Sequence, residues 1–237
     1  KILRFEGHYH GWFDNIAWNF APPLNEAGPR ERPNLLPTTK GQLLEESAGL
    51  VVLPWNDLAL VEQLFADEGD NIAGVITEPI MCNWGAIMPR PGFLEGLRKV
   101  CDHYGVVLIF DEVITGFREA LGGAQEYFNV TPDLATFAKA MGGSVCVSAV
   151  AGKEKFMHLF GELKTVHAGT YNANPVSMAG AMAALNALSE NDGALLKSTF
   201  EIGGSLIAGI KELAEKSSFS IAVRGLPPTF HVSFLPE

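Results

Sequence analysis

Short runs of apolar and β-branched residues alternate with helical spacings along the middle of the chain. Residues 71–77 and 105–110 predict strands, and the second run is apolar at nearly every position, as expected for a strand covered on both faces. Residues 91–104 between them predict a helix, because apolar side chains recur at helical spacing, a proline opens the segment and a glycine follows it. This order indicates an α/β fold with a mostly parallel sheet covered by helices.

The patterns continue toward both ends of the chain. A helix rich in alanine, methionine and leucine begins at Asn174-Pro175 and runs to about Leu188, and a charged helix covers 192–216. Further strands are predicted over residues 1–5, 134–138, 148–151, 220–224 and 230–234. We therefore expect a large domain over residues 1–188 and the start of a small C-terminal α+β domain over residues 189–237. Because strand patterns open and close the chain, which lacks an initiator methionine, we expect a piece of a longer protein.

Residues 12–40 do not follow this alternation of strand and helix patterns. They contain five prolines and show no clear periodicity. A loop this long in a compact domain is usually functional or mobile, although a surface loop without a role fits the pattern equally well.

Composition narrows the class of protein. Hydrophobic residues make up 47% and charged residues 19% of the 237 positions, which excludes general disorder. The net charge of -10 argues against a nucleic-acid-binding face and against a polybasic membrane surface. No apolar run approaches the roughly 20 residues of a membrane span, and the N-terminus has no signal-peptide pattern.

The cysteines bear on the cellular compartment. Cys82, Cys101 and Cys146 share no metal-ligand spacing and lie in apolar stretches. We expect buried thiols in a reducing compartment, and hence a cytoplasmic protein without a cysteine metal site.

Asp111 and Glu112 directly follow the buried strand at 105–110. Ligands of open α/β sheets bind outside the carboxyl ends of the strands, so Asp111 is a candidate functional group. A cap on the following turn is the alternative. A poorly solvated Asp111 would need a cationic partner to stay ionised.

Lys139 also lies just past a predicted strand, among small and apolar neighbours. Desolvation there would lower the pKa of the amine and make it a nucleophile toward an aldehyde. A lysine that extends from the strand end into solvent is the plainer interpretation. Together, a strand-end aspartate and a lysine in a small-residue pocket suggest pyridoxal 5'-phosphate chemistry. The aspartate would keep the pyridine nitrogen protonated, and the lysine would carry the cofactor as a Schiff base.

Ordered motifs then identify a resemblance. The chain resembles the class III aminotransferases, which are fold-type I enzymes that use pyridoxal phosphate, and within them the branch of glutamate-1-semialdehyde 2,1-aminomutase and its transaminase relatives. The motifs that carry this resemblance cover nearly the whole chain: 5–11 (FEGHYHG), 77–79 (TEP), Asn83, 110–118 (FDEVITGFR), 122–125 (GGAQ), 131–134 (TPDL), 137–143 (FAKAMGG) and 167–170 (HAGT).

The resemblance implies roles around the cofactor ring. Lys139 matches the Schiff-base lysine, and Asp111 matches the partner of the pyridine nitrogen. Tyr9 and Val113 match the residues on the two faces of the ring. Asn83 matches a residue that hydrogen-bonds the phenolic oxygen. Without the motifs, Tyr9 and Val113 would be assigned to the core and Asn83 to a turn.

Other matched positions concern the surroundings of the cofactor. Thr170 matches a threonine that reaches the phosphate of the neighbouring subunit's cofactor, which implies a homodimer with shared active sites; a plain turn is the alternative. Glu78 and His10 match motif positions that we interpret as supporting rather than catalytic. The 12–40 loop falls where the aminomutases have a gating loop, so we hypothesise a lid.

The chain departs from the family pattern at two places. After Gly143 the family usually continues with glycine, a large residue and proline, whereas this chain has Ser-Val-Cys-Val over 144–147. Residues 11–14 read Gly-Trp-Phe-Asp, unlike the Gly-His-Ala/Ser-Asp of the aminomutases, which favours an intermolecular transaminase.

The leading hypothesis is an aminotransferase that moves an amino group from an amino acid or amine donor to a keto acid or aldehyde by a ping-pong mechanism. An intramolecular glutamate-1-semialdehyde aminomutase is the first alternative, and a non-catalytic relative is the second. A hydrolase metal site of Asp111, Glu112 and His103 is disfavoured, because adjacent strand residues point in opposite directions. The sequence does not identify the substrate.

Overall fold

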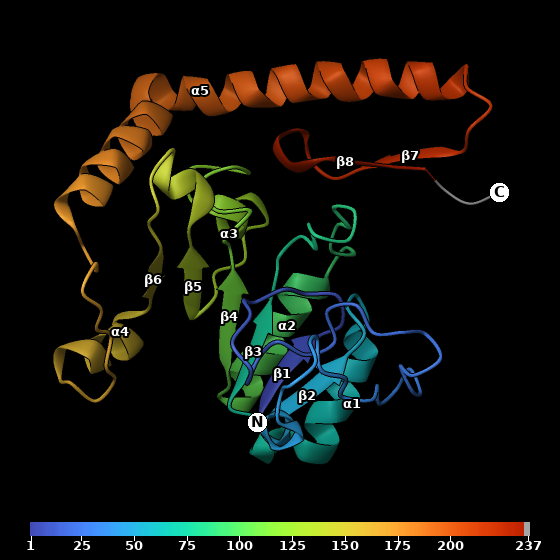
Figure 1. Ribbon diagram of the computed structural model, residues 1–237, viewed down its shortest axis with the longest axis vertical. Helices are drawn as coiled ribbons and strands as arrows, with labels where there is room; N and C mark the ends of the chain where they lie inside the picture. Colours follow the sequence, from blue (N-terminus) through green and yellow to red (C-terminus); the bar gives the residue numbers. More distant parts are fainter. Residues whose placement is uncertain (235–237) are drawn as a thin grey trace.

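A six-stranded sheet forms the centre of the computed structural model, which describes residues 1–234 (Figure 1). The strand order is β2-β1-β3-β4-β5-β6. All neighbouring pairs are parallel except β5 and β6, which confirms the prediction of a mostly parallel sheet. The strands are β1 (Ile2–Phe5), β2 (Leu50–Leu53), β3 (Gly74–Thr77), β4 (Val107–Asp111), β5 (Leu134–Phe137) and β6 (Ala149–Gly152).

Helices connect and flank the strands. They are α1 (Leu58–Glu68), α2 (Phe93–Tyr104), α3 (Gly123–Tyr127), α4 (Glu154–Gly161) and α5 (Pro175–Glu215), with short 3₁₀ helices η1 (Leu44–Gly49), η2 (Gly69–Asn71), η3 (Lys139–Gly142) and η4 (Pro227–Thr229). The periodicity of α2 predicted its extent to within two residues. The sequence analysis assigned neither β2 nor α1; Asp57 caps α1 by accepting a hydrogen bond from the Leu60 amide at 3.2 Å.

The main core lies between α1, α2 and the sheet. The predicted apolar face of α2 is buried, and its Phe93, Leu94 and Leu97 belong to one apolar cluster with Val75 and Phe110 of the sheet. This burial holds β1, β3 and β4 side by side. Their carboxyl ends therefore meet at a single edge of the sheet.

The label α5 covers the two helices expected at 174–188 and 192–216, which are separated by a break. Its backbone is non-helical from Glu190 to Gly193, where Asn191 and Asp192 adopt left-handed conformations. Figure 1 shows the resulting bend, with β7 (Ile221–Arg224) and β8 (His231–Phe234) lying along the second half of the helix. These last two strands pair in antiparallel fashion.

The loop at 12–40 contains turns but no helix or named strand. Trp18 is fully buried, and Asn19 exchanges backbone and side-chain hydrogen bonds with Leu36. Two ion pairs join the outer part of the loop to the region of α1: Arg30–Asp57 at 2.5 Å and Arg32–Glu68 at 2.8 Å. The loop is thus attached at several points along its length.

The cysteine prediction is only partly correct. Cys101 is buried and Cys82 is half-buried, but Cys146 is exposed. Side chains alternate between inward and outward along 145–147, so the inward positions fall to the two flanking valines. Within residues 1–234, no helix is both long and apolar enough to cross a membrane.

Candidate active site

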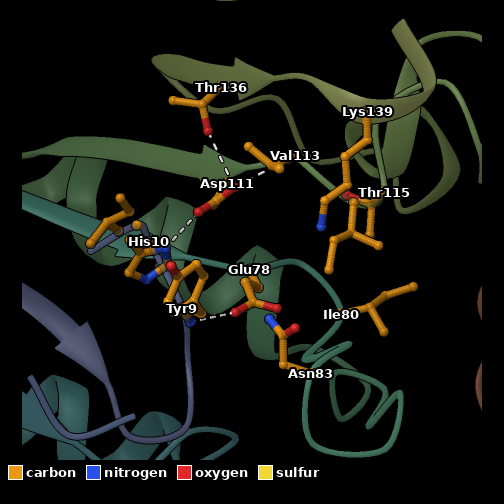
Figure 2. A pocket seen from close by; sticks show the side chains of 13 residues that line it. Tyr9, His10, Glu78, Ile80, Asn83, Asp111, Val113, Thr115, Thr136 and Lys139 are labelled. Atoms are coloured by element: carbon orange, nitrogen blue, oxygen red, sulfur yellow. Dashed lines mark hydrogen bonds and ion pairs between the residues drawn. The ribbon is translucent and has the colours of Figure 1, made fainter. Parts of the chain in front are cut away.

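A cavity of about 310 Å³ opens at the carboxyl edge of the sheet. Polar residues of its lining lie at or beyond the ends of four parallel strands: Tyr9 and His10 follow β1, Glu78 follows β3, Asp111 ends β4, and Lys139 follows β5. This edge is where ligands of open α/β sheets bind. Five of the six predicted site residues line the cavity, namely Tyr9, Asn83, Asp111, Val113 and Lys139 (Figure 2).

Asp111 is held by three hydrogen bonds. Its Oδ1 accepts from the Val113 amide at 3.1 Å and from the Thr136 hydroxyl at 3.3 Å. Its Oδ2 lies 2.8 Å from Nδ1 of His10. The carboxylate is only 8% exposed, so these contacts fix its direction at the cavity wall.

The expected cationic partner of Asp111 is absent among these contacts. Burial lowers the pKa of His10, and the hydrogen bond and charge of Asp111 offset this only in part. The contact from His10 therefore comes from a neutral imidazole that donates its Nδ1 hydrogen. Hydrogen bonds from this ring, a hydroxyl and an amide orient Asp111, and the expected cationic partner stays a prediction.

Lys139 begins η3 directly after β5 and has a left-handed φ of 44°. A residue with a Cβ adopts this conformation only when its surroundings compel it. The side chain runs into the cavity from the side opposite Glu78 (Figure 2). The expectation of a desolvated lysine was wrong: Lys139 is exposed, because the cavity that it enters is open to solvent in this chain.

Glu78 connects the loops that follow β1 and β3. It accepts hydrogen bonds from the amides of Tyr9 at 2.7 Å and Cys82 at 3.2 Å, while its own amide donates to Nδ1 of His8 at 3.0 Å. Burial, with a smaller effect of the charge of Asp111, raises the pKa of Glu78 to about 7. This network sets the position of Tyr9, whose ring lies against Phe20 with centroids 5.3 Å apart.

Glu112 points away from Asp111 and has structural partners. It accepts hydrogen bonds from Thr115 at 3.1 Å, from the amide and side chain of Gln125 at 3.2 and 3.0 Å, and from the Ala124 amide. It thereby joins the turn after β4 to the start of α3. In the part of the chain that the structure describes, no cluster of histidine, cysteine or carboxylate side chains is arranged to hold a metal ion.

Sequence reasoning missed several wall residues. Thr115 and Thr136 add hydroxyls, and Ile76, Ile80 and Ile114 add apolar surface. Ile76 and Thr136 lie near the carboxyl ends of β3 and β5, while Ile80 follows β3 and Ile114 and Thr115 follow β4. These positions were the available signal, but the residue types themselves give none. Thr170 is exposed and lies outside the cavity lining, so its role across a dimer stays a prediction.

Comparisons with known proteins identify the family of the chain. The chain belongs to the class III aminotransferases, whose family model matches residues 36–232. It is 45% identical over 81% of its length to glutamate-1-semialdehyde 2,1-aminomutase of Desulfovibrio desulfuricans, covering 44% of that protein. It is 37% identical over 99% of its length to the enzyme of the same name from Methanocaldococcus jannaschii, covering 53%.

Solved structures agree with this assignment. An omega-transaminase from Sphaerobacter thermophilus matches all of this chain with a TM-score of 0.92 and 33% identity, over 54% of its own chain. The chain thus spans about half the length of the relatives it matches. The predicted family and fold-type I architecture are confirmed.

Proposed function

We propose that this chain is the central part of an aminotransferase that uses pyridoxal phosphate. The enzyme moves an amino group from an amino acid or amine donor to a keto acid or aldehyde by a ping-pong mechanism. One observation carries the proposal: in a chain of the class III family, Lys139 and Asp111 line one cavity at the carboxyl edge of the sheet.

The donor set of the cavity fits this cofactor. An amine and a buried carboxylate enter one space whose walls include Ile80, Val113 and Ile114, which suits a flat aromatic ring bearing an aldehyde and a basic nitrogen. When bound, pyridoxal phosphate supplies an aldehyde that reacts with amines and a ring that accepts electrons.

Each residue then has a defined task. Asp111 keeps a proton on the ring nitrogen, and His10 directs the carboxylate by donating from Nδ1. The amine of Lys139 would hold the cofactor aldehyde and would be the group that moves a proton to and from the substrate carbon. Tyr9 and Val113 pack on the two ring faces.

The remaining roles follow the family pattern. Asn83 donates to the phenolic oxygen of the cofactor. Thr170 binds the phosphate in the partner subunit of a homodimer. We further propose a large domain over residues 1–188, a small domain beginning at 189, and a cytoplasmic location.

Borohydride reduction of the full-length protein with peptide mapping tests the proposal. The expected result is one reduced cofactor adduct, on Lys139, and none in the Lys139→Ala variant. Lys153→Ala is the matched control, because Lys153 pairs with Asp133 at 2.7 Å outside the cavity and its loss should leave the adduct intact. An adduct on another lysine would overturn the site, and no adduct at all would favour a non-catalytic relative.

An intramolecular aminomutase is the second candidate, favoured by the names of the relatives at 45% and 37% identity. The two activities differ in their need for a free acceptor. Full turnover of glutamate 1-semialdehyde without added keto acid would identify the mutase, whereas a strict need for keto acid would identify the transaminase.

A further inference from the structure

The segment at 144–147 lies between η3 and β6. Val145 and Val147 are half-buried, while Ser144 and Cys146 are exposed. This alternation turns both valine side chains toward the protein. The segment therefore acts as a packed connection rather than as a free loop.

Val145 packs against Gly180 on α5. A Cβ placed on Gly180 would lie only 2.6 Å from Cγ2 of Val145, a distance that real Cβ atoms essentially never show, and 3.0 Å from its Cγ1. Val147 makes the equivalent contact with Gly142, the last residue of η3, where a Cβ would lie 2.7 Å from its Cγ1. Gly180 thus leaves the space that the Val145 side chain occupies, and Gly142 does the same for Val147.

Backbone hydrogen bonds complete this connection. The Val145 amide donates to the Gly142 carbonyl at 3.1 Å, and the Ser177 hydroxyl of α5 donates to the Cys146 carbonyl at 3.0 Å. Helix α5 therefore holds the segment from one side, and the segment holds the end of η3 from the other.

Lys139 stands at the opposite end of the same short helix. A four-residue 3₁₀ helix has little stability of its own, and η3 has no side-chain cap. The left-handed backbone of Lys139 is strained, and packing elsewhere must offset this strain. The contacts of Val145 and Val147 contribute to that packing, together with the direct contact of α5 with η3.

We propose that Val145, packed against Gly180, is a positioning residue that sets the direction from which the Lys139 amine enters the cavity. The proposal rests on the proposed function. Val145 does not line the cavity, so it acts through η3. Because the χ1 rotation of valine is restricted, a larger side chain at position 180 displaces the backbone of the segment rather than only the Val145 side chain.

The Gly180→Ala variant of the full-length holoenzyme tests the proposal. The added methyl group should displace Val145 and, through η3, Lys139. We expect kcat to fall by about 10- to 100-fold with KM changed less than about 3-fold, since small misplacements of a reacting group have effects of this size. The pH at which the visible absorption of the bound cofactor titrates should also shift.

Matched variants separate positioning from general damage. Gly204→Ala lies on the same helix with no atom within 4 Å of the new Cβ, and it should leave kcat and the pH titration unchanged. In the double variant Val145→Ala/Gly180→Ala the smaller side chain makes room, so kcat and the titration should return toward wild type. If Gly180→Ala does not fold, Val145→Ala alone should still lower kcat and shift the titration.

The outcomes distinguish this inference from the proposed function. If borohydride traps no cofactor on Lys139 of the wild-type enzyme, the proposed function fails. If wild-type Lys139 is trapped, but Gly180→Ala and Val145→Ala change only the unfolding temperature, the positioning role is overturned. An absence of rescue in the double variant would also overturn it.

Discussion

Nδ1 of His10 lies 2.8 Å from Oδ2 of Asp111, although 101 positions separate the two residues along the chain. His10 is a buried side chain with a pKa that burial lowers, and its Nε2 has no hydrogen-bond partner among residues 1–234. The imidazole is therefore neutral near pH 7 and donates from Nδ1. The contact orients Asp111 in the wall of the cavity.

Loss of this donor should weaken catalysis without removing the carboxylate. The His10→Phe variant leaves Oδ2 of Asp111 without its partner, and hydrogen bonds to charged groups contribute about 1.5–3 kcal/mol. We expect kcat/KM to fall by roughly 10- to 100-fold. His103→Gln, an exposed change on α2, should have no effect in the same steady-state assay. Equal activities of the two variants would contradict the positioning of Asp111 by His10.

Removal of the carboxylate itself should have a larger effect. The Asp111→Ala variant should retain coloured cofactor poorly and lose turnover by about 100-fold or more, because a preorganised charge at the reacting ring is lost. Absorption spectra after gel filtration and kcat measure the two effects. Asp102→Ala is the control, since Asp102 is exposed and pairs with Arg98. Near-normal turnover of Asp111→Ala would refute the proposed role.

Stability should fall as pH rises through the titration of Glu78. Burial raises its pKa from 4.5 to about 7, so the unfolded state loses this proton more readily than the folded state. The contribution of Glu78 is therefore fully present below pH 4.5 and is lost as pH rises toward about 7 and above.

The Glu78→Gln variant, which stays neutral, should remove this loss. Its free energy of unfolding relative to wild type should increase between pH 4.5 and 8, by a few kcal/mol at most. Burial likewise raises the pKa of Glu119 to about 7. The free energy of unfolding of Glu119→Gln relative to wild type should therefore show the same dependence on pH. A stability difference between Glu78→Gln and wild type that does not vary with pH would disprove the prediction.

The lid hypothesis for residues 12–40 can be tested by limited proteolysis. Opening of the loop would have to break the ion pairs Arg30–Asp57 and Arg32–Glu68. Trypsin should cut after Arg30 in the free enzyme and more slowly with substrate bound. The Arg32→Gln variant should be cut faster, since one attachment is lost. Equal cutting with and without substrate would remove the hypothesis.

Local patterns were sufficient to predict the layered α/β fold and the sheet edge at which Asp111 and Lys139 lie. The spacing of apolar residues in α2 and the continuous apolar run of β4 reflect the burial of one face or of both. Asp111 and Lys139 follow strands directly, and parallel strands bring their carboxyl ends to one edge, so their meeting followed from position in the sequence.

Packing between distant segments determined the features of the fold and of the site that the sequence pattern did not predict. The four-residue strand β2 carries too little pattern to be assigned alone, and its place depends on pairing with β1. Three further features depend on which surfaces meet in space: the hydrogen bond of His10 to Asp111, the exposure of Lys139, and the packing of Val145 against Gly180. Periodicity records whether a residue is buried, but it does not record which neighbour buries it.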